Sequence, residues 1–174
     1  NSHLELWLTQ RSHHANLTYF ALALSVAVFS GFELAIVGAQ TPAELALSLR
    51  WAHVPIAAIV VLIVLFVRQY FGVGRLWLAW AAVAFRLLTV LLNFTTGDNV
   101  NFQEVTALVH TPFMGGVVSS PIGTLNEWQI VAQIANLLLV AFVVDASVKL
   151  WRLGDPVARR RATGVGGGFL ACVV

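Results

Sequence analysis

Residues 76–94, "LWLAWAAVAFRLLTVLLNF", form an apolar run whose one charged side chain is Arg86. A helix needs roughly 20 mostly apolar residues to cross about 30 Å of hydrocarbon, so this run has the length of a membrane span. Residues 17–38, 51–67 and 128–150 have the same character. The sequence therefore predicts an all-α fold, a polytopic transmembrane helical bundle with four complete spans.

The composition of the whole chain agrees with a membrane location. Hydrophobic residues make up 59% of the 174 residues and charged residues only 10%, whereas charged residues are about 25% of a typical soluble domain. The mean hydropathy is +0.82. A sequence pI near 9.2 would suggest nucleic acid as the partner of a soluble chain, but here the basic residues follow the membrane topology. We expect the lipid bilayer, and no nucleic acid, as a partner.

Both ends of the chain are predicted to be cut. The run at residues 166–174 is apolar but much shorter than a span, so we interpret it as a truncated fifth helix. The chain starts at Asn1, and "HLELWL" at residues 3–8 has the character of the tail of an earlier helix. Residues 1–174 are thus expected to be a single transmembrane domain, with room for a larger bundle of about seven spans.

The distribution of basic residues predicts the orientation of the spans. Eight of the ten Lys and Arg residues fall on one side of an alternating topology: Arg11, Arg68, Arg75, Lys149, Arg152, Arg159, Arg160 and Arg161. Cytoplasmic loops carry the excess of Lys and Arg, so residues 68–75 and 151–163 are predicted to be cytoplasmic. Residues 39–50 and 95–127 then lie outside.

Residues 41–44, "TPAE", carry the signals of a helix start. Thr41 is a predicted N-cap, Pro42 occupies the first helical position, and Glu44 has the spacing of a capping box. The second helix is therefore predicted to begin before the hydrocarbon. Pro55 lies inside this helix, removes one backbone hydrogen bond and is expected to bend the helix near its outer end.

The outer loop at residues 95–127 interrupts the apolar pattern. Asn101 and Glu104 repeat the spacing of a helix cap. The residues that follow Asn101 place apolar side chains on one helical side: Phe102, Val105, Leu108 and Val109. We therefore expect a short amphipathic helix on the outer membrane surface.

Several polar side chains fall at one depth of the predicted bundle, which we call the polar layer. With a rise of 1.5 Å per residue from the cytoplasmic helix ends, they lie roughly 20–26 Å deep, and they are Glu33, His53, Asn93, Gln133 and Asn136. Arg86 lies at roughly 15 Å and can reach toward Glu33. An ionisable side chain inside a membrane usually faces the bundle and has a partner. We expect a Glu33–Arg86 ion pair, which is either purely structural or also lines a cavity.

A candidate ligand site combines the polar layer with the loop above it. Its predicted members are Glu33, His53, Arg86, Asn93, Asp98, Glu104 and His110. Residues 93–110 would form a lid over a floor of His53 and Glu33. Histidine and carboxylate side chains bind zinc-like metals, so His53 and His110 are candidate metal ligands. A small polar or amphipathic organic ligand, or a purely structural cap, explains the same residues, and the cofactor is left open.

No catalytic motif is found in the sequence. The GxSxG, HExxH, paired-cysteine and phosphate-loop patterns do not occur, so this segment is not expected to be an enzyme by itself. Asp145 and Lys149 have the spacing of an ordinary ion pair on a helix near its inner end.

Four stretches, "TPAELALSLRWAHVP", "FVRQYFGVGRLWLAW", "RLLTVLLNFTTGDNVNFQEVTALVHTPFMG" and "FVVDASVKLWRLGD", resemble the multi-helix membrane input region of certain bacterial PAS-containing sensor histidine kinases. The resemblance covers most of residues 10–170. It implies a signal-input module of a two-component sensor in the bacterial inner membrane, with residues 39–50 and 95–127 in the periplasm. For a kinase input region it also implies a homodimer, and a cytoplasmic output that follows further helices.

Two other classes of membrane protein stay open. A subunit of an electron-transfer complex would bind haem through His53 or His110, or quinone in the polar layer. Two histidines at matched depth on facing helices are the haem signature, and His53 has no such partner within a span. A transporter would need a polar path across the whole membrane, to which the inner half contributes Asp145 alone.

Overall fold

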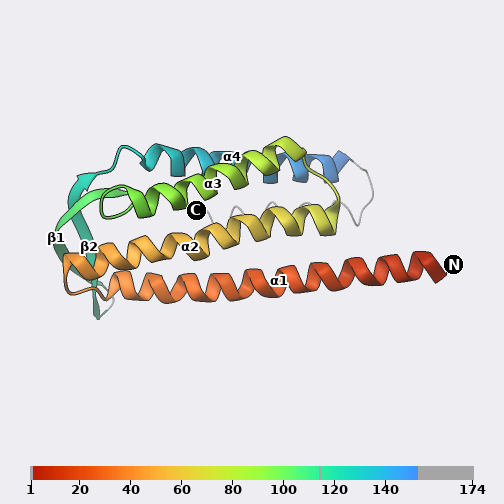
Figure 1. Ribbon diagram of the computed structural model, residues 1–174. Coiled ribbons are helices and arrows are strands. Elements are labelled where there is room, and N and C mark those ends of the chain that lie inside the picture. The colour runs from red at the N-terminus through yellow and green to blue at the C-terminus, as the bar shows by residue number, and fades with distance from the viewer. Residues whose placement is uncertain (1, 114, 153–174) are drawn as a thin grey trace.

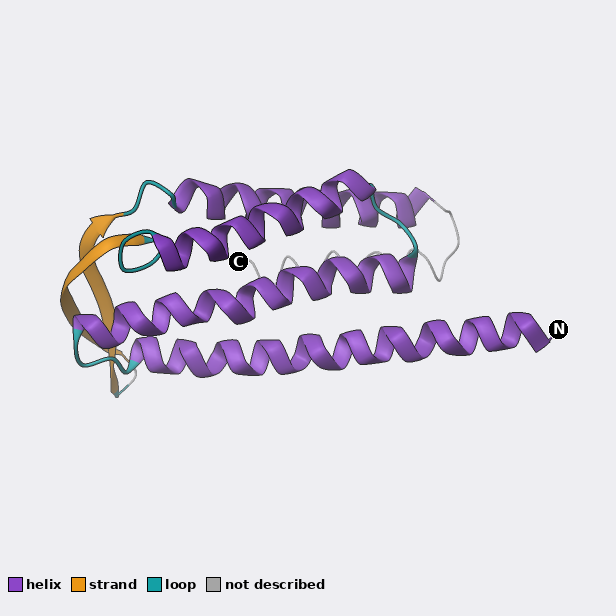
Figure 2. Cartoon of the chain, viewed as in Figure 1, coloured by secondary structure: helices purple, strands orange, loops and turns teal. Residues whose placement is uncertain are grey.

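The computed structural model describes residues 2–113 and 115–152. In chain order the elements are α1 (Ser2–Val37), α2 (Pro42–Phe66), the π-helical turn η1 (Val67–Phe71), α3 (Leu76–Thr95), β1 (Phe102–Phe113), β2 (Gly116–Leu125) and α4 (Gln129–Arg152). The helices run side by side, and the two strands cover one end of the bundle (Figure 1 and Figure 2). We call this the hairpin end and the opposite end, which carries η1, the turn end. The predicted fifth span and the linker from residue 153 onward lie outside the described residues.

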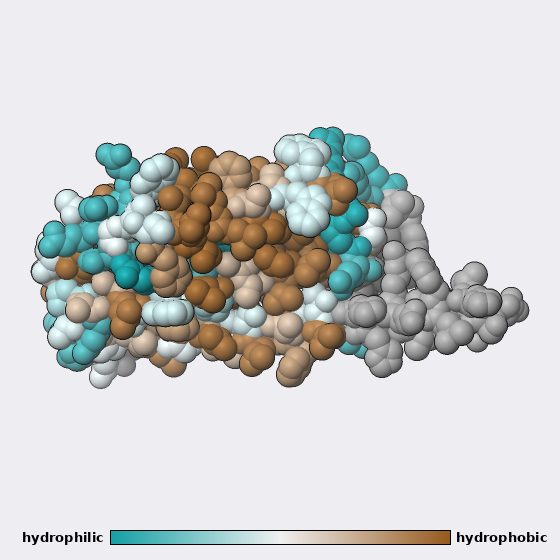
Figure 3. All heavy atoms as spheres, in the orientation of Figure 1, coloured by the Kyte–Doolittle hydropathy of each residue, from teal (hydrophilic) through white to brown (hydrophobic). Residues whose placement is uncertain are grey.

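Four helices are long and apolar enough to cross a membrane, which confirms this part of the predicted fold. They cover Asn16–Val37, Pro42–Gln69, Leu76–Thr95 and Gln129–Arg152. Helix α1 is continuous from Ser2, so "HLELWL" belongs to the helix of the first span and not to an earlier one. In the space-filling view an apolar band crosses the middle of the molecule, between hydrophilic side chains toward its ends (Figure 3).

The prediction of an amphipathic helix in the outer loop is wrong. This loop forms two β-strands, and the fold is therefore not all-α. Strands β1 and β2 pair as an antiparallel hairpin in which His110 lies opposite Ser119. Phe102, Val105 and Leu108 have helical spacing, and they reach one side of β1 because its register shifts between Phe102 and Glu104 and between Val105 and Ala107. Val105 is the one buried position of β1. Valine and threonine recur in this segment, and β-branched side chains favour strands.

Side chains just before β1 supply hydrogen bonds that set the start of the hairpin. Asn99 Oδ1 accepts from the backbone N–H groups of Asn101 and Phe102, at 2.9 and 3.0 Å, which is the pattern of an Asx turn. Asp98 Oδ2 accepts from the Val105 backbone N–H at 2.8 Å. These bonds hold the chain in a turn that leads into the strand, so the cap spacing at Asn101 starts no helix.

The main hydrophobic core lies between α2, α3 and α4 toward the turn end. Its buried members are Val60, Val64, Val67, Leu78, Ala79, Ala82, Leu139, Phe142, Val143 and Ala146. The three alanines let helix backbones approach closely, as small residues do in membrane bundles. Helix α1 packs along α2 and leaves Leu17, Phe20 and Leu34 exposed, so its outer face has the character of a lipid-facing surface.

The start of α2 confirms the predicted cap. Thr41 Oγ1 accepts from the Glu44 backbone N–H at 3.2 Å, and the Glu44 carboxylate accepts from the Gln40 backbone N–H at 3.0 Å. Helix α2 then runs unbroken through Pro55 to Phe66. The bend at Pro55 stays a prediction.

Candidate functional site

Asn93, near the end of α3, joins three parts of the chain at the hairpin end. Its side chain is fully buried. The Asn93 Nδ2 donates to the Arg50 carbonyl in α2 at 2.7 Å, and its Oδ1 accepts from the Val100 backbone N–H at 3.0 Å. The amide thus holds α2, α3 and the loop before β1 together.

Arg50 in α2 holds the same loop through its guanidinium. Its Nε donates to the Asp98 carbonyl at 2.6 Å, and a terminal nitrogen donates to the Gly97 carbonyl at 2.7 Å. Arg50 is not among the site residues predicted from the sequence. A signal was available, because Arg50 is a basic residue at the outer end of a helix and faces a loop that has no Lys or Arg.

Asn126 connects β2 to the start of α4. Its Nδ2 donates to the Asn99 carbonyl at 2.9 Å and to Thr96 Oγ1 at 3.1 Å. Its Oδ1 accepts from the Trp128 backbone N–H at 3.1 Å, immediately before α4 begins. The side chain is buried, so the connection between strand and helix is fixed at this residue. The following residues together are called the hairpin hub: Arg50, Asn93, Asn99 and Asn126.

A groove of about 500 Å³ lies between the first turns of α2 and β1, and we call it the α2–β1 groove. Its charged lining residues are Arg50, Asp98 and Glu104, and Ala46 and Leu47 contribute apolar surface. The groove brings together two of the predicted site residues, Asp98 and Glu104. Charges of both signs beside an apolar wall suit a small polar ligand.

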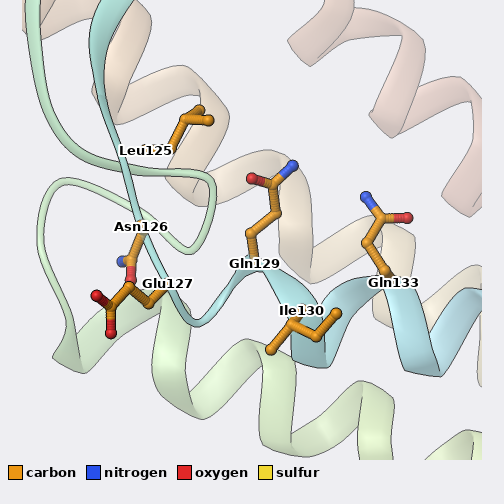
Figure 4. A pocket seen from close by; sticks show the side chains of 6 residues that line it. All are labelled: Leu125, Asn126, Glu127, Gln129, Ile130 and Gln133. Carbon is orange, nitrogen blue, oxygen red and sulfur yellow. The ribbon is translucent and has the colours of Figure 1, made fainter.

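A second pocket, of about 350 Å³, lies at the hairpin end of α4. Six residues line it: Leu125, Asn126, Glu127, Gln129, Ile130 and Gln133 (Figure 4). Gln129 and Gln133 project from the same side of α4. Gln133 belongs to the predicted polar layer, and the structure adds Gln129 one turn nearer the hairpin.

The predicted Glu33–Arg86 ion pair is wrong. Glu33 is exposed on α1, which packs along α2, whereas Arg86 is buried in α3 with 3% of its surface exposed. A terminal nitrogen of Arg86 donates instead to Asn136 Oδ1 on α4. The Arg86 Nε is buried and has no hydrogen-bond partner among the described residues.

The two predicted metal ligands take part in separate hydrogen bonds. His53 is buried in α2, and its Nδ1 lies 2.9 Å from the Leu49 carbonyl; since a carbonyl only accepts, Nδ1 carries the proton. The exposed His110 has its Nδ1 at 3.0 Å from Ser119 Oγ. The Ser119 hydroxyl donates to the Ala39 carbonyl at 2.7 Å. His110 and Ser119 therefore tie the hairpin to the connection between α1 and α2.

Residues 93–110 do not form the predicted lid over one floor. Within the described part of the chain, no three His, Cys, Asp or Glu side chains come together in a way that would hold a metal ion. His53 lies inside the bundle, His110 lies on the hairpin, and Glu33 is exposed on α1. The predicted site is thus divided between the α2–β1 groove, the hairpin with its hub, the interior that holds His53 and Arg86, and the outer surface of α1.

The turn end has an ion cluster around Asp145 of α4. Lys149 Nζ lies 2.9 Å from Asp145 Oδ2, which confirms the predicted pair within the helix. Arg75, just before α3, adds its backbone N–H at 2.8 Å from Asp145 Oδ2 and its Nε at 3.4 Å from Oδ1. Asp145 therefore joins the turn before α3 to α4.

Comparison with known proteins returns no match. No protein-family model, no curated protein and no solved structure matches this chain. Function is therefore inferred from the placement of the residues described above.

Proposed function

We propose that this chain is the membrane-embedded signal-input module of a bacterial two-component sensor protein. In this proposal the hairpin end detects a ligand outside the cell, and a conformational change passes through the bundle to a cytoplasmic output. The observation that carries the proposal is the short connection from β2 into α4. Strand β2 ends at Leu125 and α4 begins at Gln129, and the buried Asn126 between them is bonded to the loop after α3.

A ligand at the hairpin would act on α4 through this connection. The α2–β1 groove is lined by Arg50 and Asp98, and Arg50 also bonds the loop that Asn126 holds. A ligand shifts an equilibrium only if it binds one conformation better than another. A ligand that pulls Arg50 away from the loop carbonyls would meet this condition, because it would loosen the loop and change the position of α4.

The charged residues of the turn end support a cytoplasmic location for this end and a response there to movement of α4. Basic residues gather at this end: Arg68, Arg75, Lys149 and Arg152. An excess of Lys and Arg marks cytoplasmic loops, which puts the hairpin in the periplasm if the membrane is the bacterial inner membrane. The Asp145 cluster contacts both α4 and the turn before α3, so displacement of α4 would be felt by two segments on the cytoplasmic side. Because sensor kinases act as dimers, the resemblance to their input regions extends the proposal to a homodimer of this chain.

The proposal is tested by measuring whether a change at Asn126 reaches the turn end. Spin labels are placed at Trp77 and Val148, which are exposed near the turn ends of α3 and α4, in a Cys172→Ser background. Their separation is measured by pulsed electron paramagnetic resonance in lipid nanodiscs. Asn126→Ala should shift or broaden the distance distribution, because it releases the outer end of α4.

The matched control is Thr106→Ala, which removes a hydrogen bond between the two strands and leaves Asn126 in place. The control should keep the parent distribution. Identical distributions in the parent, the control and Asn126→Ala would contradict transmission through α4. A Soret band in the absorbance spectrum of the purified protein would instead favour the haem-binding alternative.

A further inference from the structure

Arg86 is a buried charge in the middle of the bundle. It lies ten residues after Leu76 and nine before Thr95 in α3, so at 1.5 Å per residue it is about 15 Å from either end of the helix. Only 3% of its surface is exposed. Arginine stays protonated in proteins, and a charged side chain at this depth costs free energy unless it is paired.

No carboxylate pairs with Arg86 in the described part of the chain. Its terminal nitrogen donates to the neutral amide of Asn136, and its Nε is left without an acceptor. Glu33 is exposed on α1, and Asp145 is engaged by Arg75 and Lys149 at the turn end. His53, buried in α2 and within electrostatic range of Arg86, is no source of negative charge. The guanidinium therefore keeps one buried donor, Nε, without a partner and has no counter-charge among the described residues.

A row of amides leads from the hairpin end of α4 to Arg86. Gln129 and Gln133 project from one side of α4 into the pocket of about 350 Å³ (Figure 4). Asn136 follows three residues after Gln133, and residues three apart are neighbours on a helix surface. Gln133 and Asn136 are both exposed, so the partner of Arg86 is itself accessible from outside the bundle.

We propose that Arg86 binds the carboxylate of a long-chain fatty acid, which reaches it along the amides of α4. A carboxylate matches the planar donors of a guanidinium and can occupy two of them at once. The exposed Ile130 and Leu137 lie beside the amides on α4 and offer apolar contact for the acyl chain. This site is separate from the α2–β1 groove, and binding there does not depend on a signalling role.

Depth decides between a free fatty acid and a phospholipid headgroup. The hydrocarbon of a bilayer is about 30 Å thick, and headgroup phosphates lie beyond it. A phosphate would have to move about 15 Å inward to meet a residue in the middle of a span. A single-chain acid has no second acyl chain to carry along, and its carboxylate is the smaller charged group.

Binding is measured on the full chain in a nonionic detergent by native mass spectrometry. The probes are oleate, oleyl alcohol, dioleoylphosphatidylglycerol and decylubiquinone. Oleate should bind saturably at one molecule per chain, whereas the alcohol, which has the same chain and no charge, should not. Arg86→Gln should weaken oleate binding at least about tenfold, because hydrogen bonds to charged groups are lost. Arg152→Gln removes an exposed basic residue at the end of α4 and should leave binding unchanged.

A second variant keeps the test decisive if Arg86→Gln does not fold. Asn136→Asp places a carboxylate against Arg86 and supplies within the protein the anion that the ligand would bring. This variant should fold and should lose oleate binding, while Gln103→Glu, which adds the same charge on the exposed hairpin, should keep it. Oleate binding that survives Asn136→Asp would overturn the proposal. Failure of oleate to bind the parent chain would also overturn the proposal. So would Arg86-dependent binding of phosphatidylglycerol or decylubiquinone without binding of oleate.

Discussion

At the residue scale, the hairpin end depends on amide side chains that bind backbone atoms. Asn93, Asn99 and Asn126 each accept from a backbone N–H, and Asn93 and Asn126 also donate to a backbone carbonyl. A buried backbone group without a partner costs free energy. Each amide therefore fixes the position of the segment whose backbone it satisfies, and loops without regular structure become part of a rigid end.

Asn93→Ala tests this role directly. The substitution leaves the buried Val100 N–H without its partner and removes the second hydrogen bond of the Arg50 carbonyl, which keeps its bond within α2. An unsatisfied buried group costs about 1–3 kcal/mol. We expect the free energy of unfolding to fall by about 2 kcal/mol or more, measured by denaturant unfolding in detergent. Thr95→Ala is the control, because the exposed Thr95 hydroxyl bonds only to carbonyls of its own helix. Equal stability of the two variants would contradict the role of Asn93.

Depth in the bundle could be predicted from the sequence, whereas the direction of a side chain could not. The helix rise placed Arg86 in the middle of the bundle and Glu33 and Asn93 toward its outer end. In the structure Arg86 also lies midway along α3, and Glu33 and Asn93 lie near the hairpin ends of α1 and α3. Whether a side chain faces a neighbouring helix depends on which helices pack together. Helix α1 packs along α2, so Glu33 is turned away from Arg86, and no local pattern around residue 33 could have shown this.

At the scale of elements, the turn between η1 and α3 fixes how closely α3 and α4 approach. Gly74 has a φ of +96°, in the left-handed region that side chains disfavour. A Cβ at this position would lie 2.6 Å from the ring of Phe142, which belongs to the core on α4. Gly74 is therefore required for two reasons: it adopts the positive φ of the turn, and its lack of a side chain leaves room for Phe142 of α4.

Gly74→Ala should be more destabilising than Gly72→Ala. Both positions have positive φ, with +67° at Gly72, so both variants incur about 1–2 kcal/mol of backbone strain. A Cβ at Gly72 meets no atom within 4 Å, whereas one at Gly74 also displaces the Phe142 ring. The difference between the thermal unfolding midpoints of the two variants reports this clash together with the less favourable backbone angle at Gly74. A midpoint for Gly74→Ala as high as that for Gly72→Ala would show that the ring moves at no cost.

The helices could be predicted from the sequence because their signal is local and long. Runs of about 20 apolar residues have few alternatives in a membrane, and the Thr41 cap needs only its own neighbours. The hairpin could not be predicted in this way. Phe102, Val105 and Leu108 have the spacing of a helix face, and they share one side of β1 only because of its register shifts. Pairing with residues 116–125 decides for the strand, and a short sequence window does not contain this contact.

At the scale of the whole molecule, the bundle has unlike ends. The hairpin end carries the hairpin hub and the α2–β1 groove, and the turn end carries most of the described basic residues and the Asp145 cluster. The apolar band lies between them (Figure 3). The difference in charge between the two ends is the reason why the proposed function has the hairpin outside the cell.

Cysteine labelling tests that placement. In a Cys172→Ser background, a cysteine at Thr111, which is exposed on β1, should react with a membrane-impermeant maleimide in intact cells. A cysteine at Ala158, which lies outside the described residues, should react only after lysis, because positive-inside orientation puts it in the cytoplasm. Labelling at Ala158 in intact cells, or protection at Thr111, would reverse the proposed topology.

The hairpin also has a consequence for biosynthesis. Residues 95–127 contain no Lys or Arg, and their carboxylates are Asp98, Glu104 and Glu127. In the proposed orientation this segment must be carried across the membrane before α3 and α4 can pair. An elementary charge that crosses a potential of 100 mV gains or loses about 2.3 kcal/mol, and in a cell with a negative interior the outward movement of carboxylates is favourable. The membrane potential of such a cell would therefore favour insertion of α3 and α4 as a pair.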